Sequence, residues 1–141
     1  MAGTQPMRTL YPFAEVFEVA TTGTTAVDVW DIPAGTLITM VLAEVETAPT
    51  GDANNVTVGD DDDADGYILA GAACGATAGT IYGDSVQERG VYLVADGVIG
   101  IHGGYWKSYT SAGKEVKVVL SAAATTEATM RIYIFGYRYK V

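Results

Sequence analysis

The sequence contains few of the residues that build metal sites and nucleophilic active sites. Among 141 residues there is one cysteine, Cys74, and one histidine, His102. A single cysteine excludes an internal disulfide, and one residue of each type cannot supply the four ligands of a structural zinc site. Cys74 lies among alanines and glycines, which predicts a small buried side chain. No Gly-x-Ser-x-Gly motif accompanies His102, so we expect that the chain is not an enzyme.

Long apolar runs are absent as well. No run approaches the roughly 20 residues that span a bilayer, and residues 1–12 lack the apolar core of a secretory signal peptide. We therefore expect no membrane partner, and synthesis in the cytoplasm without export. Hydrophobic residues still make up 49% of the chain and charged residues only 18%, which favours a folded domain over disorder. A chain of 141 residues is long enough for one domain with a single core.

Basic residues are scarce and unevenly distributed. The chain has 8 Lys and Arg against 17 Asp and Glu, and its net charge is −9. Residues 9–88 include fourteen acidic residues and no basic one, whereas residues 89–141 include seven basic and three acidic ones. Affinity for nucleic acid depends on Lys and Arg, so we predict no nucleic-acid partner. Either the fold interleaves the two halves and their charges cancel, or a basic face meets an acidic neighbour.

Alternating apolar residues and glycine-rich turns predict an all-β fold. The predicted strands cover residues 14–19, 26–30, 36–45, 57–60, 67–69, 91–94, 98–101, 116–120 and 130–135. One face of the long strand is expected to carry Ile38, Met40, Leu42, Glu44 and Glu46, and to leave the core near its end. No helix of about 10 residues or more is predicted. This pattern predicts a single jelly-roll-like β-sandwich or barrel.

The strongest turn signal in the sequence is Asp96-Gly97. Both central residues of a type I′ turn need a positive φ, and this dipeptide adopts it readily. It lies between the apolar segments 91–94 and 98–101. We therefore predict a β-hairpin over residues 91–101.

Residues 1–12 differ from the rest of the chain. They include Pro6 and Pro12 and have little periodicity, so we predict an extended N-terminal arm, followed by a β-sandwich domain over residues 13–141. The arm docks either on the protein's own surface or on a neighbouring subunit. In the second case, the predicted contacts with the partner are Thr4, Met7, Arg8 and Leu10. Arg8 would pair with an acidic neighbour, and Met7 and Leu10 would fill shallow pockets.

The last predicted strand has two different faces. One face carries the aliphatic residues Met130, Ile132 and Ile134. The other carries the aromatic residues Tyr133, Phe135, Tyr137 and Tyr139. A strand of this kind is covered on both sides, either by a second sheet or by another subunit, so these aromatic residues are predicted partner contacts.

The acidic segment 61–66 matches the opening of a calcium-binding loop. Asp61, Asp63 and Asp65 place carboxylates at alternate positions, and Gly66 follows where such a loop turns. The closing position is occupied by Ala72, where a bidentate glutamate is required. A solvated acidic turn is therefore favoured over a calcium site, and no other cofactor is expected.

Three aromatic residues, Tyr105, Trp106 and Tyr109, could form a platform for sugar rings. Tyrosine and tryptophan are also enriched in protein cores and interfaces, because they bury a large area and keep one polar group. A core or interface role is favoured over carbohydrate binding.

A resemblance to a known family rests on three segments. Ile32-Pro33-Ala34-Gly35-Thr36 precedes a long strand, and Thr57-Val58-Gly59-Asp60 and Asp65-Gly66-Tyr67 follow it. This arrangement resembles small β-sandwich virion proteins of tailed bacteriophages, in particular capsid decoration, or cement, proteins. The resemblance implies a non-enzymatic trimer on the outer surface of the capsid. Its partner would be the major capsid protein, and an N-terminal arm would clamp neighbouring capsomers.

Two other functions remain open at this point. The same fold could belong to a tail, neck or head-fibre protein that contacts the host surface. It could also be a carbohydrate-binding β-sandwich module, in which case Trp106 would contact the sugar.

Overall fold

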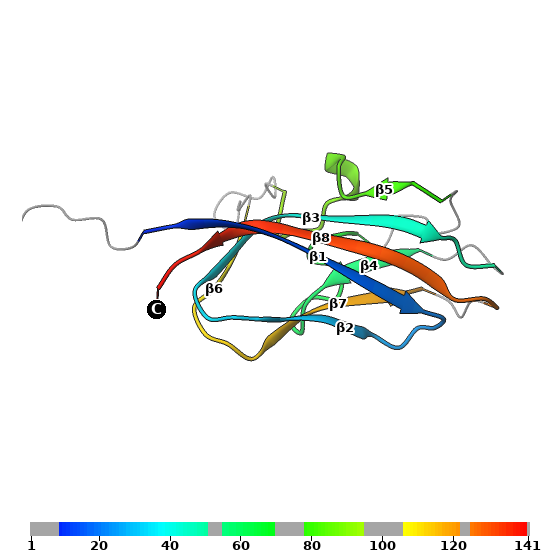
Figure 1. Cartoon of the computed structure of the whole chain (residues 1–141), viewed down its shortest axis with the longest axis horizontal. Helices are drawn as coiled ribbons and strands as arrows, with labels where there is room; N and C mark the ends of the chain where they lie inside the picture. Colours follow the sequence, from blue (N-terminus) through cyan, green and yellow to red (C-terminus); the bar gives the residue numbers. More distant parts are fainter. Residues whose placement is uncertain (1–8, 51–54, 70–77, 95–105, 122–124, 141) are drawn as a thin grey trace, which may run out of the picture.

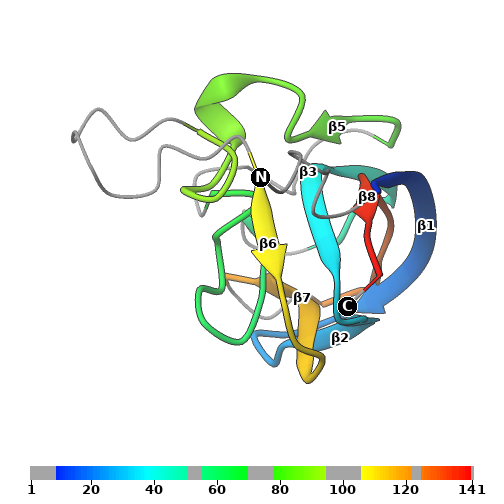
Figure 2. The same cartoon turned by 90° about the vertical axis from the view of Figure 1, so that its left-hand side faces the viewer.

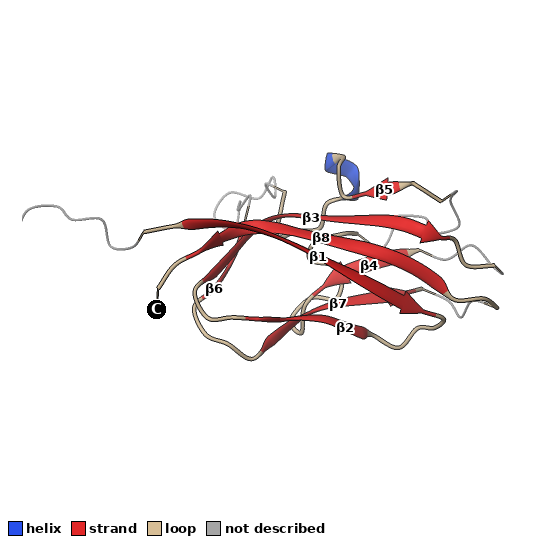
Figure 3. Cartoon of the chain, in the orientation of Figure 1, coloured by secondary structure: helices blue, strands red, loops and turns tan. Residues whose placement is uncertain are grey.

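The computed structural model describes residues 9–50, 55–69, 78–94, 106–121 and 125–140. Within these ranges the chain forms β-strands and one short 3-10 helix, η1, as Figure 3 shows. Their bounds are β1 Tyr11–Thr21, β2 Val27–Ile32, β3 Thr36–Thr47, β4 Val56–Gly59, β5 Ile81–Tyr82, η1 Val86–Glu88, β6 Lys107–Tyr109, β7 Lys114–Leu120 and β8 Ala128–Arg138. The predicted all-β fold is confirmed.

The strands form two antiparallel sheets that lie face to face (Figure 1). The larger sheet has the order β1-β8-β3-β5, and β6 also pairs with β3. The smaller sheet has the order β2-β7-β4. Figure 2 views the two layers from one end, where β6 lies beside β3. The fold is therefore a β-sandwich, the first of the two predicted architectures.

The core fills the space between the two sheets. Alternate residues of β7 and β8 are buried in it, as the two-residue period of a strand requires. The fully buried aliphatic side chains are Ile32, Ile38, Val41, Val45, Val56, Val58, Ile68, Val116, Val118, Leu120, Met130, Ile132 and Ile134. Burial of one such side chain stabilises the folded state by about 1.5–3 kcal/mol relative to exposure. The many β-branched residues among them also suit the extended backbone.

The prediction for the core side of β3 is correct for its first residue and wrong for those that follow. Ile38 is fully buried, but Met40 is exposed and Leu42 is only half-buried. The pairing of β3 with β8 shifts between Ile38 and Met40. This bulge adds one residue to β3, so the side chains that follow it change face. The core side of β3 is then continued by Val41, Ala43 and Val45.

The predicted hairpin over residues 91–101 is wrong in its first strand. Residues 91–94 form a turn, in which the Leu93 N–H donates to the Gly90 carbonyl at 3.0 Å. Leu93 is buried, so this apolar segment packs into the core without pairing in a sheet. Residues 96–101 lie outside the described residues, as do Cys74 and His102. The predicted strand at residues 67–69 is reduced to isolated bridges from Ile68 to Val58 and Arg89.

The predicted arm overlaps the first strand. β1 begins at Tyr11, and its pairing with β8 runs without a break from Tyr11 opposite Arg138 to Thr21 opposite Ala128. Leu10 is 49% exposed, and residues 1–8 lie outside the described residues. The last two residues of the predicted arm therefore belong to the sheet. In the described part of the chain, no helix is long and apolar enough to cross a membrane.

Candidate functional site

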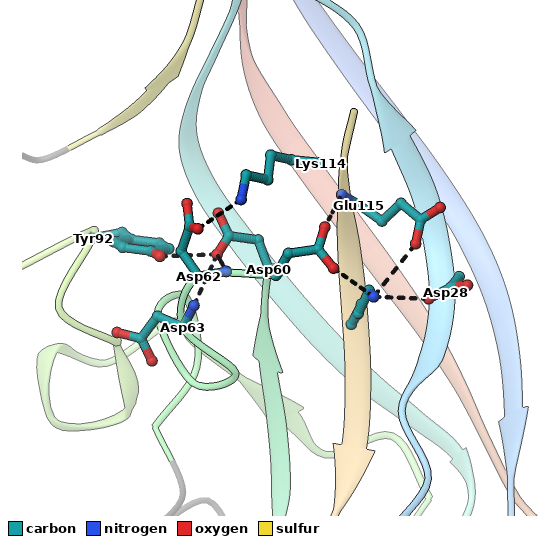
Figure 4. A network of polar contacts seen from close by, with 9 residues as sticks. Asp28, Asp60, Asp62, Asp63, Tyr92, Lys114 and Glu115 are labelled. Carbon is teal, nitrogen blue, oxygen red and sulfur yellow. Dashed lines mark hydrogen bonds and ion pairs between the residues drawn. The ribbon is translucent and has the colours of Figure 1, made fainter. Parts of the chain in front are cut away.

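The acidic turn, residues 60–66, is organised around one buried carboxylate. Asp60 follows β4 directly, and only 4% of its surface is exposed. One oxygen accepts hydrogen bonds from the Tyr92 hydroxyl at 2.9 Å and from the N–H groups of Asp62 and Asp63 at 2.9 and 3.1 Å. The other accepts one from the Tyr109 hydroxyl at 2.6 Å. Figure 4 shows Tyr92 and the turn converging on this carboxylate. Asp60 thus joins β4, the turn and β6.

Three tyrosines complete this buried cluster. The hydroxyls of Tyr67 and Tyr109 are hydrogen-bonded to each other, and the rings of Tyr67 and Tyr92 pack edge to face at 5.2 Å. Burial raises the pKa of Tyr67 and of Tyr109 far above the ordinary value of 10.0. Burial and the charge of Asp60 have the same effect on the pKa of Tyr92. The three phenols therefore stay protonated and act as hydrogen-bond donors.

Two other carboxylates of the turn, those of Asp61 and Asp62, contact lysines of β7. Lys117 lies 2.6 Å from Asp61 and 3.5 Å from Asp28. Lys114 lies 2.6 Å from Asp62. Figure 4 draws this pair as a dashed line. These pairs join acidic residues of the first half of the chain to basic residues of the second half. These pairs balance part of the charge asymmetry of the sequence within the fold, and a net charge of −9 remains.

The calcium candidates do not converge. Asp61 is paired with Lys117 and also accepts the Glu115 N–H at 3.0 Å. Asp63 accepts the N–H of Asp65 at 3.3 Å. The described residues contain no group of three or more ligand-type side chains that could hold a metal ion. The hydrogen bonds and ion pairs of the turn connect it to the rest of the fold, which is a structural role.

Calcium should bind this turn weakly or not at all, because a cation would have to displace the lysines that already neutralise Asp61 and Asp62. We expect titration calorimetry to give no calcium affinity tighter than about 10⁻⁵ M, the weak limit of sensor sites. The variant Asp65→Asn serves as the matched control and should behave as the parent protein does. Tighter binding that this variant removes would contradict a purely structural turn.

The stability of the protein should depend on the charge of Asp61. The hydrogen bond from Lys117 is the main reason that the pKa of Asp61 lies below its ordinary value of 3.8. The folded state therefore holds this proton less tightly than the unfolded state, and the stabilisation is complete above pH 3.8 and lost as pH falls below it. Urea unfolding of the wild type and Asp61→Asn should show a stability difference at pH 7 that shrinks at pH 3. A difference that stays constant would contradict this assignment.

A second surface lies on the opposite side of the larger sheet from the core. We call it the outer face, and it consists of three cross-strand rows over β1, β8 and β3. The rows are Pro12–Tyr137–Leu37, Ala14–Phe135–Met40 and Val16–Tyr133–Leu42. Directly paired residues point to the same side of a sheet. Between them on β8 and β3, Ile134, Gly136, Ile38 and Val41 are buried on the core side, so these nine point outward.

The outer face is apolar, partly exposed and bounded by charge at one end. Val16 is 55% exposed, Tyr137 40% and Met40 36%. The next row is Glu18–Arg131–Glu44. In and beside this row, Arg131 is paired with Glu46, and the Tyr133 hydroxyl donates to Glu44 at 2.6 Å.

The structure separates the aromatic residues that the sequence grouped together. Tyr133, Phe135 and Tyr137 lie on the outer face, whereas Tyr139 is buried and its N–H donates to the Gly35 carbonyl at 2.8 Å. Of the sugar-platform candidates, Trp106 is 53% exposed. Tyr109 points into the core toward Asp60, and Tyr105 lies outside the described residues. Thr4, Met7 and Arg8 also lie outside them.

Two features of the site were missed by the sequence reasoning. The buried role of Asp60 was hidden within a run of four aspartates, although its place directly after Gly59 and the strand was a usable signal. The contribution of β1 to the outer face was missed as well. Its outward residues, Pro12, Ala14 and Val16, alternate with Phe13, Glu15 and Phe17, and this alternation was the available signal.

Comparison with known proteins gives matches to solved structures alone. No protein-family model matches the sequence, and no curated protein matches it. A chain of the cyanophage Pam1 capsid asymmetric unit is similar, with 19% identity and a TM-score of 0.61, over 98% of this chain and 91% of that chain. A chain of the acidic stable capsid structure of Helicobacter pylori bacteriophage KHP30 has 13% identity and a TM-score of 0.49, over 96% of this chain and 99% of that chain.

Proposed function

We propose that this chain is a structural protein of a tailed-phage virion, and specifically a capsid decoration protein on the outer surface of the head. One observation carries the proposal: the fold extends over 98% of this chain and 91% of a chain from the cyanophage Pam1 capsid. A match over nearly the whole of both chains leaves little of either chain outside the shared sandwich. The two chains share a fold, and we propose the role of this chain from that shared fold.

Two features of the molecule support a structural, non-enzymatic role. The carboxylates of the acidic turn are held by tyrosine hydroxyls, backbone N–H groups and lysines, so their chemistry serves the fold. The outer face, in contrast, leaves apolar side chains exposed on a regular sheet. Exposed apolar patches on folded proteins commonly mark interaction sites. The exposed apolar side chains of the outer face are therefore suited to contact another protein.

In this role the protein stabilises the capsid by bridging neighbouring capsomers as a trimer, with the major capsid protein as its partner. The protein is made in the host cytoplasm and assembles on the outer surface of the virion. Contacts from Thr4, Met7, Arg8 and Leu10 anchor it to the shell. This arrangement follows the resemblance to decoration proteins.

Binding to capsids tests the proposal. Purified protein is mixed with shells assembled from the major capsid protein of the phage that encodes this chain, and the shells are then sedimented. We expect the protein to sediment with the shells and to saturate at a fixed number of copies per shell. Failure to associate with these shells, or association only with tails, would overturn the decoration role.

The arm should contribute to attachment and little to folding. Because β1 begins at Tyr11, deletion of residues 2–9 leaves every described strand intact. We expect the melting temperature to change by only a few degrees, as for a loss of about 1 kcal/mol, while binding to shells falls sharply. Differential scanning calorimetry and shell sedimentation measure the two effects. Undiminished binding by the truncated protein would show that the arm is not the anchor.

A further inference from the structure

We propose that the outer face docks on an apolar patch of the capsid shell protein that is bordered by lysine or arginine side chains. The inference rests on the proposed function and adds to it the surface of this chain that meets the shell and the chemistry of the surface it meets. Three properties of the outer face carry it: its composition, its charge border and its backbone.

The composition of the outer face is that of an interface centre. It combines three aromatic side chains, Tyr133, Phe135 and Tyr137, with aliphatic neighbours on both adjacent strands. Tyrosine, phenylalanine and methionine are enriched at interface cores, where charged residues are depleted. The three rows span roughly 13 Å along the strands and roughly 10 Å across them. The area of the outer face is smaller than that of a standard interface, about 800 Å² per partner. We therefore assign the apolar centre of the interface to the outer face, and its rim to the residues around that face.

The charge of the border favours a basic partner over a second copy of this chain. Three carboxylates, those of Glu18, Glu44 and Glu46, lie in or beside the row that ends the face. One guanidinium, that of Arg131, lies among them and is paired with Glu46. Two copies would bring together two net charges of −9. A partner with lysine or arginine around its patch is attracted instead.

The backbone beneath the face is well ordered by its pairing. β8 is hydrogen-bonded on both sides, to β1 over eleven consecutive residue pairs and to β3 along its length. The backbone of such a strand is held in place before binding. Little conformational entropy is then lost when a partner binds, which favours this surface over a loop.

The test introduces a charge within the outer face and leaves the arm intact. Val16→Asp places a carboxylate at an exposed position of the third row, where the fold tolerates it. Val119→Asp is the matched control, because it makes the same change on a half-buried position of β7 in the opposite sheet. We expect Val16→Asp to weaken binding to shells by roughly tenfold or more, and Val119→Asp to bind as the wild type does.

The charge border is tested separately. Glu18→Lys should weaken binding to shells, and the wild-type affinity should fall with added salt more steeply than that of Glu18→Lys. Oxidation of methionines by hydrogen peroxide gives a further readout that needs no variant. Met40 should react readily in the free protein and slowly on the shell, whereas the buried Met130 should react slowly in both states.

The outcomes distinguish this inference from the proposed function. If wild-type protein does not sediment with shells, the decoration role fails. If the wild type binds and both Val16→Asp and Glu18→Lys bind equally well, with Met40 unprotected, the outer face is not the docking surface and the decoration role stands. If Val16→Asp instead dissociates an oligomer of the free protein in sedimentation velocity, the face joins copies of this chain and the inference is overturned.

Discussion

Replacement of Asp60 by alanine should destabilise the protein more than the same replacement of any other aspartate in the acidic turn. The variant removes the acceptor of two tyrosine hydroxyls and two backbone N–H groups in a site that is almost fully buried. Each buried donor that loses its partner costs about 1–3 kcal/mol. We expect a loss of about 3–5 kcal/mol and a melting temperature lower by roughly 10–20 °C, measured by calorimetry and urea unfolding.

Asp62→Ala is the matched control for this prediction. Asp62 is two residues away in the same turn, but its ion pair with Lys114 is exposed on both sides. Exposed ion pairs contribute about 0–1 kcal/mol. A similar loss of stability in both variants would show that general charge balance in the turn, and not the buried carboxylate, stabilises the fold.

Gly136→Ala should also cause a large loss of stability. A Cβ atom at this position would lie 2.0 Å from the carbonyl oxygen of Leu37 and 3.0 Å from the Cα of Ile38. The obstacle is backbone, so the central strands β3 and β8 would have to separate beside the bulge of β3. We expect a loss of about 3 kcal/mol or more, as for severe overpacking of a core, measured by urea unfolding.

Gly23→Ala provides the comparison for Gly136→Ala. At Gly23, in the turn between β1 and β2, the nearest atom to an added Cβ is 3.9 Å away. Stability should be unchanged or slightly higher, because alanine restricts the unfolded chain. Equal losses at both glycines would contradict the close approach of β8 to β3.

The β-sandwich could be predicted because its core pattern is local. The alternation of Met130, Ile132 and Ile134 with aromatic residues is visible in the sequence, and β8 has these two faces. The bulge in β3 could not be predicted, because it depends on how Ile38 and Met40 pair with a strand almost 100 residues later. The turn at residues 91–94 has the apolar composition of a strand and differs only in its tertiary contacts.

The outer face was predicted in part, from β8 alone. The aromatic residues Tyr133, Phe135 and Tyr137 were identified, but their neighbours on β1 and β3 follow from strand order, which the sequence does not specify. Tyr139 was assigned to the same face by continuing the alternation. β8 ends at Arg138, so the period of the strand no longer applies, and Tyr139 turns into the fold. The network around Asp60 could not be predicted, since it joins residues from three separate segments.

The most direct test of the account is cryo-electron microscopy of particles of the phage that encodes this chain. We expect density for a β-sandwich on the outer surface of the head, with the outer face of β1, β8 and β3 turned toward the shell. Particles that lack the gene should lack this density and should regain it when the purified protein is added. Density for this chain at the tail, or none on intact particles, would contradict the proposed role as a decoration protein.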